Sequence, residues 1–168
     1  LGKEIKHCNC LELINAIRLL TPANYKRQYS YRRPNRRFPQ WIGVIPGKVR
    51  KCSYPSILAA IDTSQSMEAE DFMRIEYALN ELMRHFVNTI TIVECDTEIR
   101  RVYNWTGKLE SVLGRGGTLL TPLFNKQALN RYKPDLAVVF TDGEFMPFAD
   151  PGIRTIWALV RPYSTCPC

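Results

Sequence analysis

Two short apolar runs constrain the fold of this chain more than any other feature of its sequence. They read SILAAI (56–61) and DLAVVF (135–140), and each is a nearly unbroken series of apolar or small residues. Runs of this length and composition are typical of strands that are buried on both faces, as in a parallel sheet. We therefore expect a central sheet that is covered by helices.

The segments around these runs predict the other elements of an α/β fold. Residues 68–87 place apolar side chains at the spacing of a helix face, and residues 89–103 contain two β-rich stretches around a short turn. The expected helices are 10–20, 68–87 and 122–131, and the further strands are 89–95, 98–103 and 154–160. This alternation predicts a doubly wound, Rossmann-like sheet of about six strands, mostly parallel, with one antiparallel edge strand.

The charges divide the chain into two parts. Residues 1–55 contain 12 Lys and Arg against 2 Asp and Glu, whereas residues 56–168 contain 11 against 14. We predict a basic N-terminal segment over 1–55 and a folded α/β domain over 56–168. Within the first, residues 24–55 are expected to form an irregular Arg- and Tyr-rich wrap with one short strand at 41–45.

No apolar run approaches the roughly 18 residues of a membrane span, and the chain does not begin with a basic and then apolar leader. We therefore expect a cytoplasmic protein that does not bind membranes. Because the chain begins at Leu1 without a methionine, we also expect it to be part of a longer protein.

The six cysteines lead us to expect reduced thiols, as is usual inside cells. His7, Cys8 and Cys10 lie near one end of the chain, and Cys166 and Cys168 lie at the other. They could hold zinc if the two ends met. The Cys-x-Cys spacing lacks the two-residue gap of the usual zinc knuckle, so we expect free thiols there instead.

Five oxygen-bearing side chains fall where a ligand site is expected. Asp62 and Asp142 follow the two apolar runs, and the carboxyl ends of strands are where open α/β sheets bind ligands. Ser64 and Ser66 alternate and so point the same way, and Thr118 follows two glycines that allow close approach. Such hard oxygen donors suit Mg²⁺, with Mn²⁺ or Ca²⁺ as alternatives.

Three stretches that carry these residues resemble a known motif. DTSQSM (62–67), GGT (116–118) and FTDGE (140–144) resemble the three parts of the metal-ion-dependent adhesion site (MIDAS) of von Willebrand factor A domains. Residues 56–160 resemble the von Willebrand factor A-like domain of bacterial proteins, which often follows a metallopeptidase-like region. YRRPNRRF (31–38) also resembles the arginine-rich stretch that precedes that domain.

The resemblance implies how a metal would be held. Ser64 and Ser66 would bind it directly, Thr118 directly or through water, and Asp62 and Asp142 mainly through water. The ion would then remain electron-poor and would favour a Glu or Asp side chain of a partner protein. The expected function is a Mg²⁺-dependent protein-interaction module, and the resemblance implies that it acts with an AAA+ ATPase.

Other interpretations of the same residues stay open. Asp62, Ser64 and Ser66 are good N-cap residues, so they could cap the helix that follows. The chain could also be the scaffold part of a larger metallopeptidase-like protein. We do not expect an enzyme, because the only histidines are His7 and His85 and no base is placed beside a serine nucleophile.

The basic segment suggests nucleic-acid binding as an alternative function. Cationic residues interleave with tyrosines, Phe38 and Trp41, a mixture that can hold phosphates and stack bases. The candidate residues are Lys26, Arg27, Arg32, Arg33, Arg36 and Arg37. We favour the other interpretation, in which the aromatic residues pack on the domain and the arginines pair with its acidic surface or are solvated, because the resembling family has the same arginine stretch.

Overall fold

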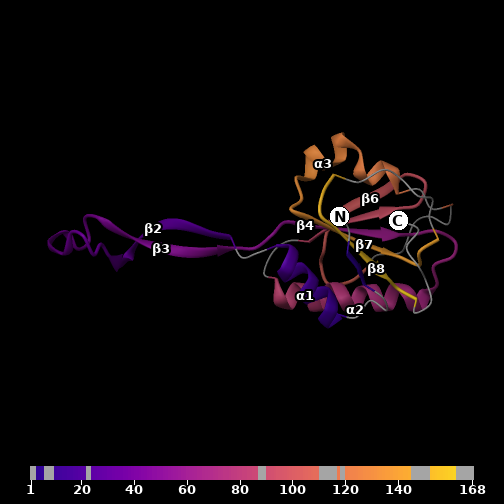
Figure 1. The fold of residues 1–168 in the computed structure, drawn as a ribbon, viewed down its shortest axis with the longest axis horizontal. Helices are drawn as coiled ribbons and strands as arrows, with labels where there is room; N and C mark the ends of the chain where they lie inside the picture. The colour runs from indigo at the N-terminus through magenta and orange to yellow at the C-terminus, as the bar shows by residue number, and fades with distance from the viewer. Residues whose placement is uncertain are drawn as a thin grey trace. The chain divides into compact units, whose positions relative to one another are not determined.

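The structure is a computed structural model that describes residues 3–5, 10–21, 24–86, 90–109, 117, 120–144 and 152–161. Its contacts divide the chain into two compact units (Figure 1). The α/β unit comprises Leu1–Thr21 and Pro55–Cys168, and the hairpin unit comprises Pro22–Tyr54.

A six-stranded sheet forms the centre of the α/β unit. Its order is β1 (Lys3–Ile5), β8 (Thr155–Leu159), β7 (Leu136–Thr141), β4 (Ile57–Asp62), β5 (Ile90–Cys95) and β6 (Ile99–Asn104). All neighbouring strands are parallel except β5 and β6, so the antiparallel strand lies at one edge. The predicted mostly parallel sheet with one antiparallel edge strand is confirmed. The short strand β1 was not predicted.

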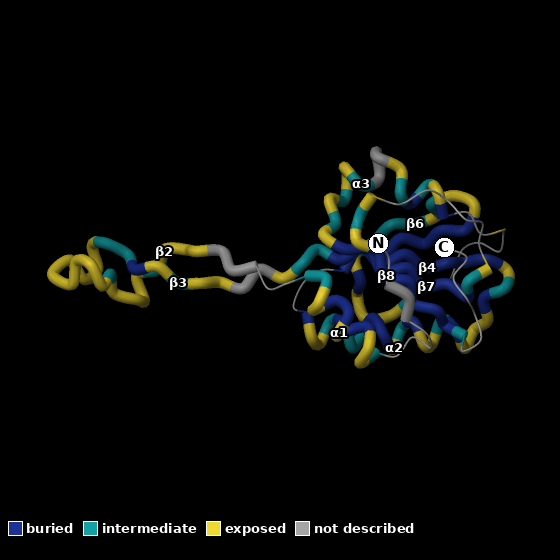
Figure 2. The backbone as a smooth tube through the Cα atoms, viewed as in Figure 1, coloured by how far each residue is buried: buried dark blue, intermediate teal, exposed yellow. Residues whose placement is uncertain are grey.

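Helices cover both faces of this sheet (Figure 1). Helices α1 (Cys10–Leu20) and α2 (Ala69–His85) pack on the face that includes Ile57, Ala59 and Ile61. The segment η3 (Thr121–Phe124), followed by α3 (Lys126–Tyr132), packs on the opposite face, which includes Leu58 and Ala60. All residues of β4 are buried because both of its faces are covered, which explains the unbroken apolar run (Figure 2).

Helix α1 belongs to the α/β unit. Its residues Leu13, Ile14, Ala16 and Ile17 are buried in the same core cluster as α2. Burial of this apolar helix face joins residues 10–20 to the sheet, although the predicted N-terminal segment 1–55 included them. The other division between the units, before Pro55, lies one residue from the predicted boundary between residues 55 and 56.

The order of the strands reverses between β4 and β7. From β4 the chain crosses through α2 to β5, then forms β6, and it returns to β7 on the other side of β4. Ligands of open α/β sheets bind at such a switch point, beyond the carboxyl ends of the strands. Asp62 at the end of β4 and Asp142 just after β7 therefore lie at the position where a ligand site is expected.

The hairpin unit consists of two antiparallel strands, β2 (Asn24–Pro34) and β3 (Pro46–Ser53), with the short helix η2 (Pro39–Trp41) in the connecting turn. The prediction of an irregular wrap with a strand at 41–45 was wrong, because those residues lie in the turn. Where its burial is described, the hairpin has no buried face, and its sequence lacks the apolar alternation that indicates a half-buried strand. Among the hairpin residues whose burial is described, only Gly47 is buried.

Gly47 lies opposite an irregularity in β2. The register shifts between Ser30 and Pro34, and the extra residues bring the backbone of Arg33 against β3. A Cβ atom at Gly47 would lie 2.2 Å from the carbonyl oxygen of Arg33. Only glycine fits there without a movement of the backbone, as is common at β-bulges.

Candidate functional site

Asp62 is fixed at the end of β4 by hydrogen bonds to both of its carboxylate oxygens. Its side chain is fully buried. The backbone N–H of Ser64 donates to Oδ1 at 2.9 Å, and the hydroxyl of Thr141 donates to Oδ2 at 2.9 Å. Thr141 is the last residue of β7, so this bond joins the two strands at the switch point. Sequence reasoning missed Thr141, although its place in FTDGE could have indicated it.

Asp142 is the second buried carboxylate of the site, with a relative exposure of 2%. Its Oδ1 accepts a hydrogen bond of 3.0 Å from the backbone N–H of Glu144. Its Oδ2 is buried and has no hydrogen-bond partner among the residues that the structure describes. A buried carboxylate oxygen without a partner is energetically costly, so a cationic or hydrogen-donating group at this atom would stabilise the site.

The two serine hydroxyls lie next to each other. Ser64 Oγ is 3.0 Å from Ser66 Oγ, and a turn closed by the Met67 N–H to the Ser64 carbonyl oxygen follows. Helix α2 begins at Ala69 and its N-cap is Glu68. The alternative that Asp62, Ser64 and Ser66 cap this helix was therefore wrong, and the serine hydroxyls do not serve the helix end.

The acidity of Asp62 reflects this arrangement. Burial raises the pKa of Asp62 above its ordinary value, hydrogen bonds from Ser64 and Thr141 act in the opposite direction, and the charge of Asp142 raises it further. The two carboxylates are thus close enough to repel each other in a desolvated place. A bound cation would relieve this repulsion.

Arg161, which follows β8 by two residues, fixes the loop that contains Ser66. Its guanidinium donates to the carbonyl oxygen of Ser66 and, at 3.0 and 3.2 Å, to Asp71 Oδ2 in the first turn of α2. The Asp71 hydrogen bond is the main cause of the raised pKa of Arg161, against which burial acts. Sequence reasoning missed Arg161, because residues 71 and 161 are joined only by the fold.

The predicted ligand Thr118 lies outside the described residues. Its neighbour Gly117 is described, and a Cβ atom built there would lie 3.9 Å from the Cγ2 atom of Thr97. Thr97 belongs to the turn that follows β5, the strand beside β4. The residue before Thr118 therefore reaches the carboxyl edge of the sheet, at a strand next to the one that ends in Asp62.

Within the described part of the chain, no group of three or more His, Cys, Asp or Glu side chains could hold a metal ion. A site at this edge would therefore depend on hydroxyl groups in addition to its two carboxylates. Of the terminal residues considered for zinc, His7, Cys8, Cys166 and Cys168 lie outside the described residues, and Cys10 forms no disulfide with a described cysteine.

The family model for the VWA-like domain (DUF2201) matches residues 57–167. The chain belongs to this family. Its VWA-like domain, named after the von Willebrand factor A fold, begins at β4 and includes Asp62, Ser64, Ser66 and Asp142. No curated protein matches the chain at a significant level.

The basic residues predicted to contact nucleic acid lie outside the matched segment, in the hairpin unit. Lys26, Arg27, Arg32 and Arg33 are on β2, and Arg36 and Arg37 are in the turn. Sequence reasoning missed three further cations on β3, namely Lys48, Arg50 and Lys51. The GKVRK pattern directly after the turn could have indicated them as part of a second strand.

None of the described helices is both long enough and apolar enough to cross a membrane.

Proposed function

We propose that the VWA-like domain recognises a partner protein through a divalent cation, preferably Mg²⁺, held at the carboxyl edge of the sheet. VWA-like domains are in general protein-interaction modules, and the family membership supports this general role for the chain. The observation that carries the metal-dependent form of the proposal is the buried and unpartnered Oδ2 atom of Asp142, beside the buried Asp62.

The donor atoms available at this edge fit a hard cation. The hydroxyls of Ser64 and Ser66 and the carboxylates of Asp62 and Asp142 are all oxygen donors, which Mg²⁺ prefers over softer ligands, and the ligand Thr118, predicted from the sequence, would add a further hydroxyl. Both oxygens of Asp62 already accept hydrogen bonds, so we assign it to positioning ligands and water. Oδ2 of Asp142 and the paired serine hydroxyls are the groups left to face the ion.

The charge of this donor set favours an acidic partner. Three of the five side chains are neutral, so a divalent ion would keep affinity for an anionic ligand. When bound, the ion would supply a coordination position for the carboxylate of a Glu or Asp from the partner. An AAA+ ATPase, suggested by the resemblance of the sequence, is one candidate partner and stays a prediction, as does the expectation that the domain is not an enzyme.

Thermal unfolding in Mg²⁺ and in EDTA tests the metal site. A ligand that binds only the folded state at 100 times its dissociation constant stabilises it by about 2.7 kcal/mol. For a chain of this size we expect the melting temperature to rise by about 5–10 °C. The double variant Ser64→Ala and Asp142→Asn should lose this rise, because it removes one hydroxyl ligand and the charge of the unpartnered carboxylate.

A matched control changes the same residue types at the opposite ends of the same strands. Asp135 Oδ2 accepts a hydrogen bond of 2.8 Å from the Ser56 N–H, just before β7 and β4. The double variant Ser56→Ala and Asp135→Asn should keep the full response to Mg²⁺. If test and control variants respond to Mg²⁺ as the wild type does, the proposed metal site is wrong.

Acetate can probe the coordination position that the proposal leaves for a partner carboxylate. In the presence of Mg²⁺ it should raise the melting temperature further, and in EDTA it should have no effect. Equal effects in both solutions would mean that acetate acts elsewhere, and recognition of a carboxylate through the metal would be contradicted.

A further inference from the structure

We propose that the hairpin unit is a binding site for single-stranded nucleic acid that works independently of the proposed metal centre. Residues 22–54 contain nine Lys and Arg and no Asp or Glu. The sequence left nucleic-acid binding as an alternative to a wrap packed on the domain. The register of the strands, the exposure of the aromatic rings and the hollow between them now favour binding.

The strand register places cations directly opposite each other. Arg27 pairs with Arg50, and the next pair along the ladder is Lys26 with Lys51. Like charges at directly opposed positions destabilise a pair of strands. Two such pairs in succession are therefore unfavourable for the hairpin alone, and a bound polyanion would convert the repulsion into attraction.

The cations of this unit whose side chains are described have no carboxylate partner within the described part of the chain. The side chains of eight of them are described, and none forms an ion pair with a described carboxylate. All eight are exposed: Arg27, Arg32, Arg33, Arg36, Arg37, Lys48, Arg50 and Lys51. When Lys and Arg side chains neutralise phosphates, the counterions condensed on the nucleic acid are released, and this release is a major source of affinity.

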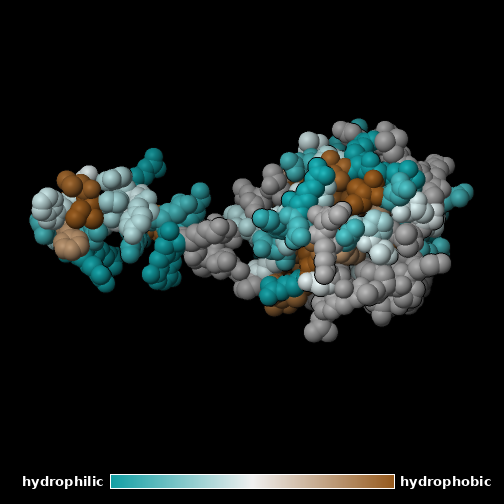
Figure 3. Space-filling view, turned by 90° about the horizontal axis from the view of Figure 1, so that it is seen from above, coloured by the Kyte–Doolittle hydropathy of each residue, from teal (hydrophilic) through white to brown (hydrophobic). Residues whose placement is uncertain are grey.

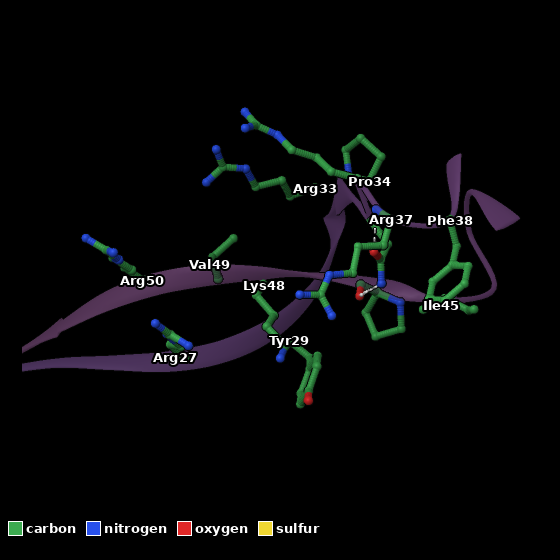
Figure 4. A pocket seen from close by; sticks show the side chains of 13 residues that line it. Arg27, Tyr29, Arg33, Pro34, Arg37, Phe38, Ile45, Lys48, Val49 and Arg50 are labelled. Atoms are coloured by element: carbon green, nitrogen blue, oxygen red, sulfur yellow. Dashed lines mark hydrogen bonds between the residues drawn. The ribbon is translucent and has the colours of Figure 1, made fainter. Parts of the chain in front are cut away.

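Cations and aromatic rings together line a hollow of about 990 Å³ on the hairpin. Six Lys or Arg residues line it, together with Tyr29 and Phe38, and Figure 4 shows these side chains on both strands and the turn. Lys48 lies over the ring of Tyr29, with its Nζ atom 5.6 Å from the ring centre. A groove of this kind can hold phosphates and bases at the same time.

Further aromatic rings are exposed along the same hairpin. Tyr29 and Tyr31 are each 70% exposed, and Trp41 is 50% exposed. The turn that holds Trp41 is fixed by backbone hydrogen bonds, including Trp41 N–H to the Phe38 carbonyl oxygen and Ile45 N–H to that of Trp41. Aromatic faces held in this way stack on unpaired bases, which are accessible in single strands and covered in a duplex.

A membrane surface explains the distribution of charge less well. Apolar side chains gather at the tip of the hairpin, where Ile42 and Val44 are exposed (Figure 3). Arg27 is seven residues before Pro34, which corresponds to about 23 Å of strand. The headgroup layer is only about 5–8 Å deep. An inserted tip would therefore leave the Arg27 and Arg50 pair far from the lipid phosphates.

An acidic protein as the bound partner would also explain fewer features of the hairpin surface. It would offer carboxylates to the cations, but it would leave the exposed tyrosine and tryptophan faces without the flat partners that unpaired bases provide. Single-stranded nucleic acid uses the cations and the rings together, and we therefore commit to it as the occupant of this surface.

Fluorescence anisotropy with a labelled oligothymidylate of about 16 nucleotides tests the proposal on the full chain. We expect binding at low salt that weakens as salt is added. The variant R27Q with R50Q should bind more weakly, and the slope of log K against log salt should fall by about 1.4, which is two phosphate contacts on a single strand. Removing these facing charges also relieves repulsion, so the variant should fold.

The control K108Q with R131Q makes the same change of net charge on exposed residues of the α/β unit. It should bind the oligonucleotide as the wild type does. The metal-site variant Asp142→Asn should also bind normally, so failure of the metal proposal and failure of this one would give different results.

Tryptophan fluorescence reports on stacking within the hairpin. Trp41 is exposed, whereas Trp105 and Trp157 are 7% and 4% exposed, so quenching by the oligonucleotide should come from Trp41 and disappear in Trp41→Phe. Absence of binding at low salt, or equal weakening by test and control charge variants, would overturn the proposal. Tighter binding of a duplex, of polyglutamate or of anionic lipid vesicles would also overturn it.

Discussion

The arginine side chains of the α/β unit and of the hairpin unit have opposite kinds of neighbours. In the α/β unit, buried carboxylates hold arginines: Asp96 pairs with Arg100 at 2.9 Å, and Asp71 pairs with Arg161 at 3.0 Å. In the hairpin, Arg27 instead faces another arginine across the ladder. In these two ion pairs of the α/β unit, each buried carboxylate has its cationic partner within the same unit. The charges of the hairpin unit have no counterpart within its own segment, which suggests that the counterpart is a ligand.

The two units also differ in how they are held together. Every residue of β4 is buried between helices, while the hairpin strands are exposed along most of their described length (Figure 2). The α/β unit is therefore stabilised by burial of apolar surface. The hairpin depends on backbone hydrogen bonds, and two-stranded hairpins are at best marginally stable alone. Core variants, charge variants and solution conditions should therefore affect the two units differently.

The two units should differ most in how much the free energy of unfolding falls when an apolar side chain is shortened. Leu79 is fully buried in α2, so Leu79→Ala should destabilise the α/β unit by about 2–5 kcal/mol through the cavity it leaves. Ile42, 70% exposed at the hairpin tip, is the matched site, and Ile42→Ala should change the free energy of unfolding by less than about 0.5 kcal/mol. Urea denaturation measures both, and similar losses would contradict the contrast.

The two units should also differ, by a smaller amount, in how much stability they lose when the pH is lowered. Burial alone would raise the pKa of Asp96, but hydrogen bonds from Arg100 and from the backbone of Glu98 and Thr97 outweigh it and lower the pKa from 3.8 to about 2. A lowered pKa stabilises the fold above pH 4, and this contribution disappears as the pH falls toward 2. Asp96→Asn should therefore cost about 2 kcal/mol at pH 7 and little at pH 2.

The exposed Glu98 of the same turn provides the control, and Glu98→Gln should leave unfolding at pH 7 almost unchanged. The hairpin contains no carboxylate, so protonation of its own side chains cannot weaken it between pH 7 and pH 2. Amide signals of β2 and β3 that respond to acid before those of β5 and β6 would contradict this account.

The smallest expected effect is a gain of stability in the hairpin. Replacing facing cations in R27Q with R50Q should stabilise β2 and β3 by about 0.2–1 kcal/mol, since like charges no longer oppose each other. Amide hydrogen exchange in these strands should slow by up to about fivefold. High salt should produce a similar change in the wild type and almost none in the variant. Faster exchange in the variant would mean that these arginines stabilise the hairpin.

The predicted elements of the α/β unit agree with the structure because their signals are local. The strands β4, β7 and β8 and the helix α2 lie within one or two residues of their predicted bounds. Burial on both faces requires apolar residues throughout a strand, and burial on one face requires them at helical spacing, so the sequence itself shows the environment. Asp62 and Asp142 could be predicted for the same reason, since they follow such strands.

The hairpin strands, and the contacts of Arg161 with Ser66 and Asp71, could not be predicted in this way. Where the burial of β2 and β3 is described, neither face is buried, so their sequence lacks the apolar alternation that most clearly predicts a strand. Arg161 forms hydrogen bonds to Ser66 and Asp71, which are 95 and 90 residues away in the sequence. Such a contact exists only after β8 and α2 have packed against the same sheet.

The sequence by itself determined that this chain forms a mostly parallel α/β sheet with carboxylates at strand ends, because alternating buried strands and amphipathic helices have few other ways to cover their apolar faces. Only the tertiary structure decided that β4 and β7 are neighbours at a switch point, and that the hydroxyl of Thr141 contacts Asp62. Strand order and register also decided which cations of the hairpin face one another, since cross-strand pairing is a property of two segments brought together.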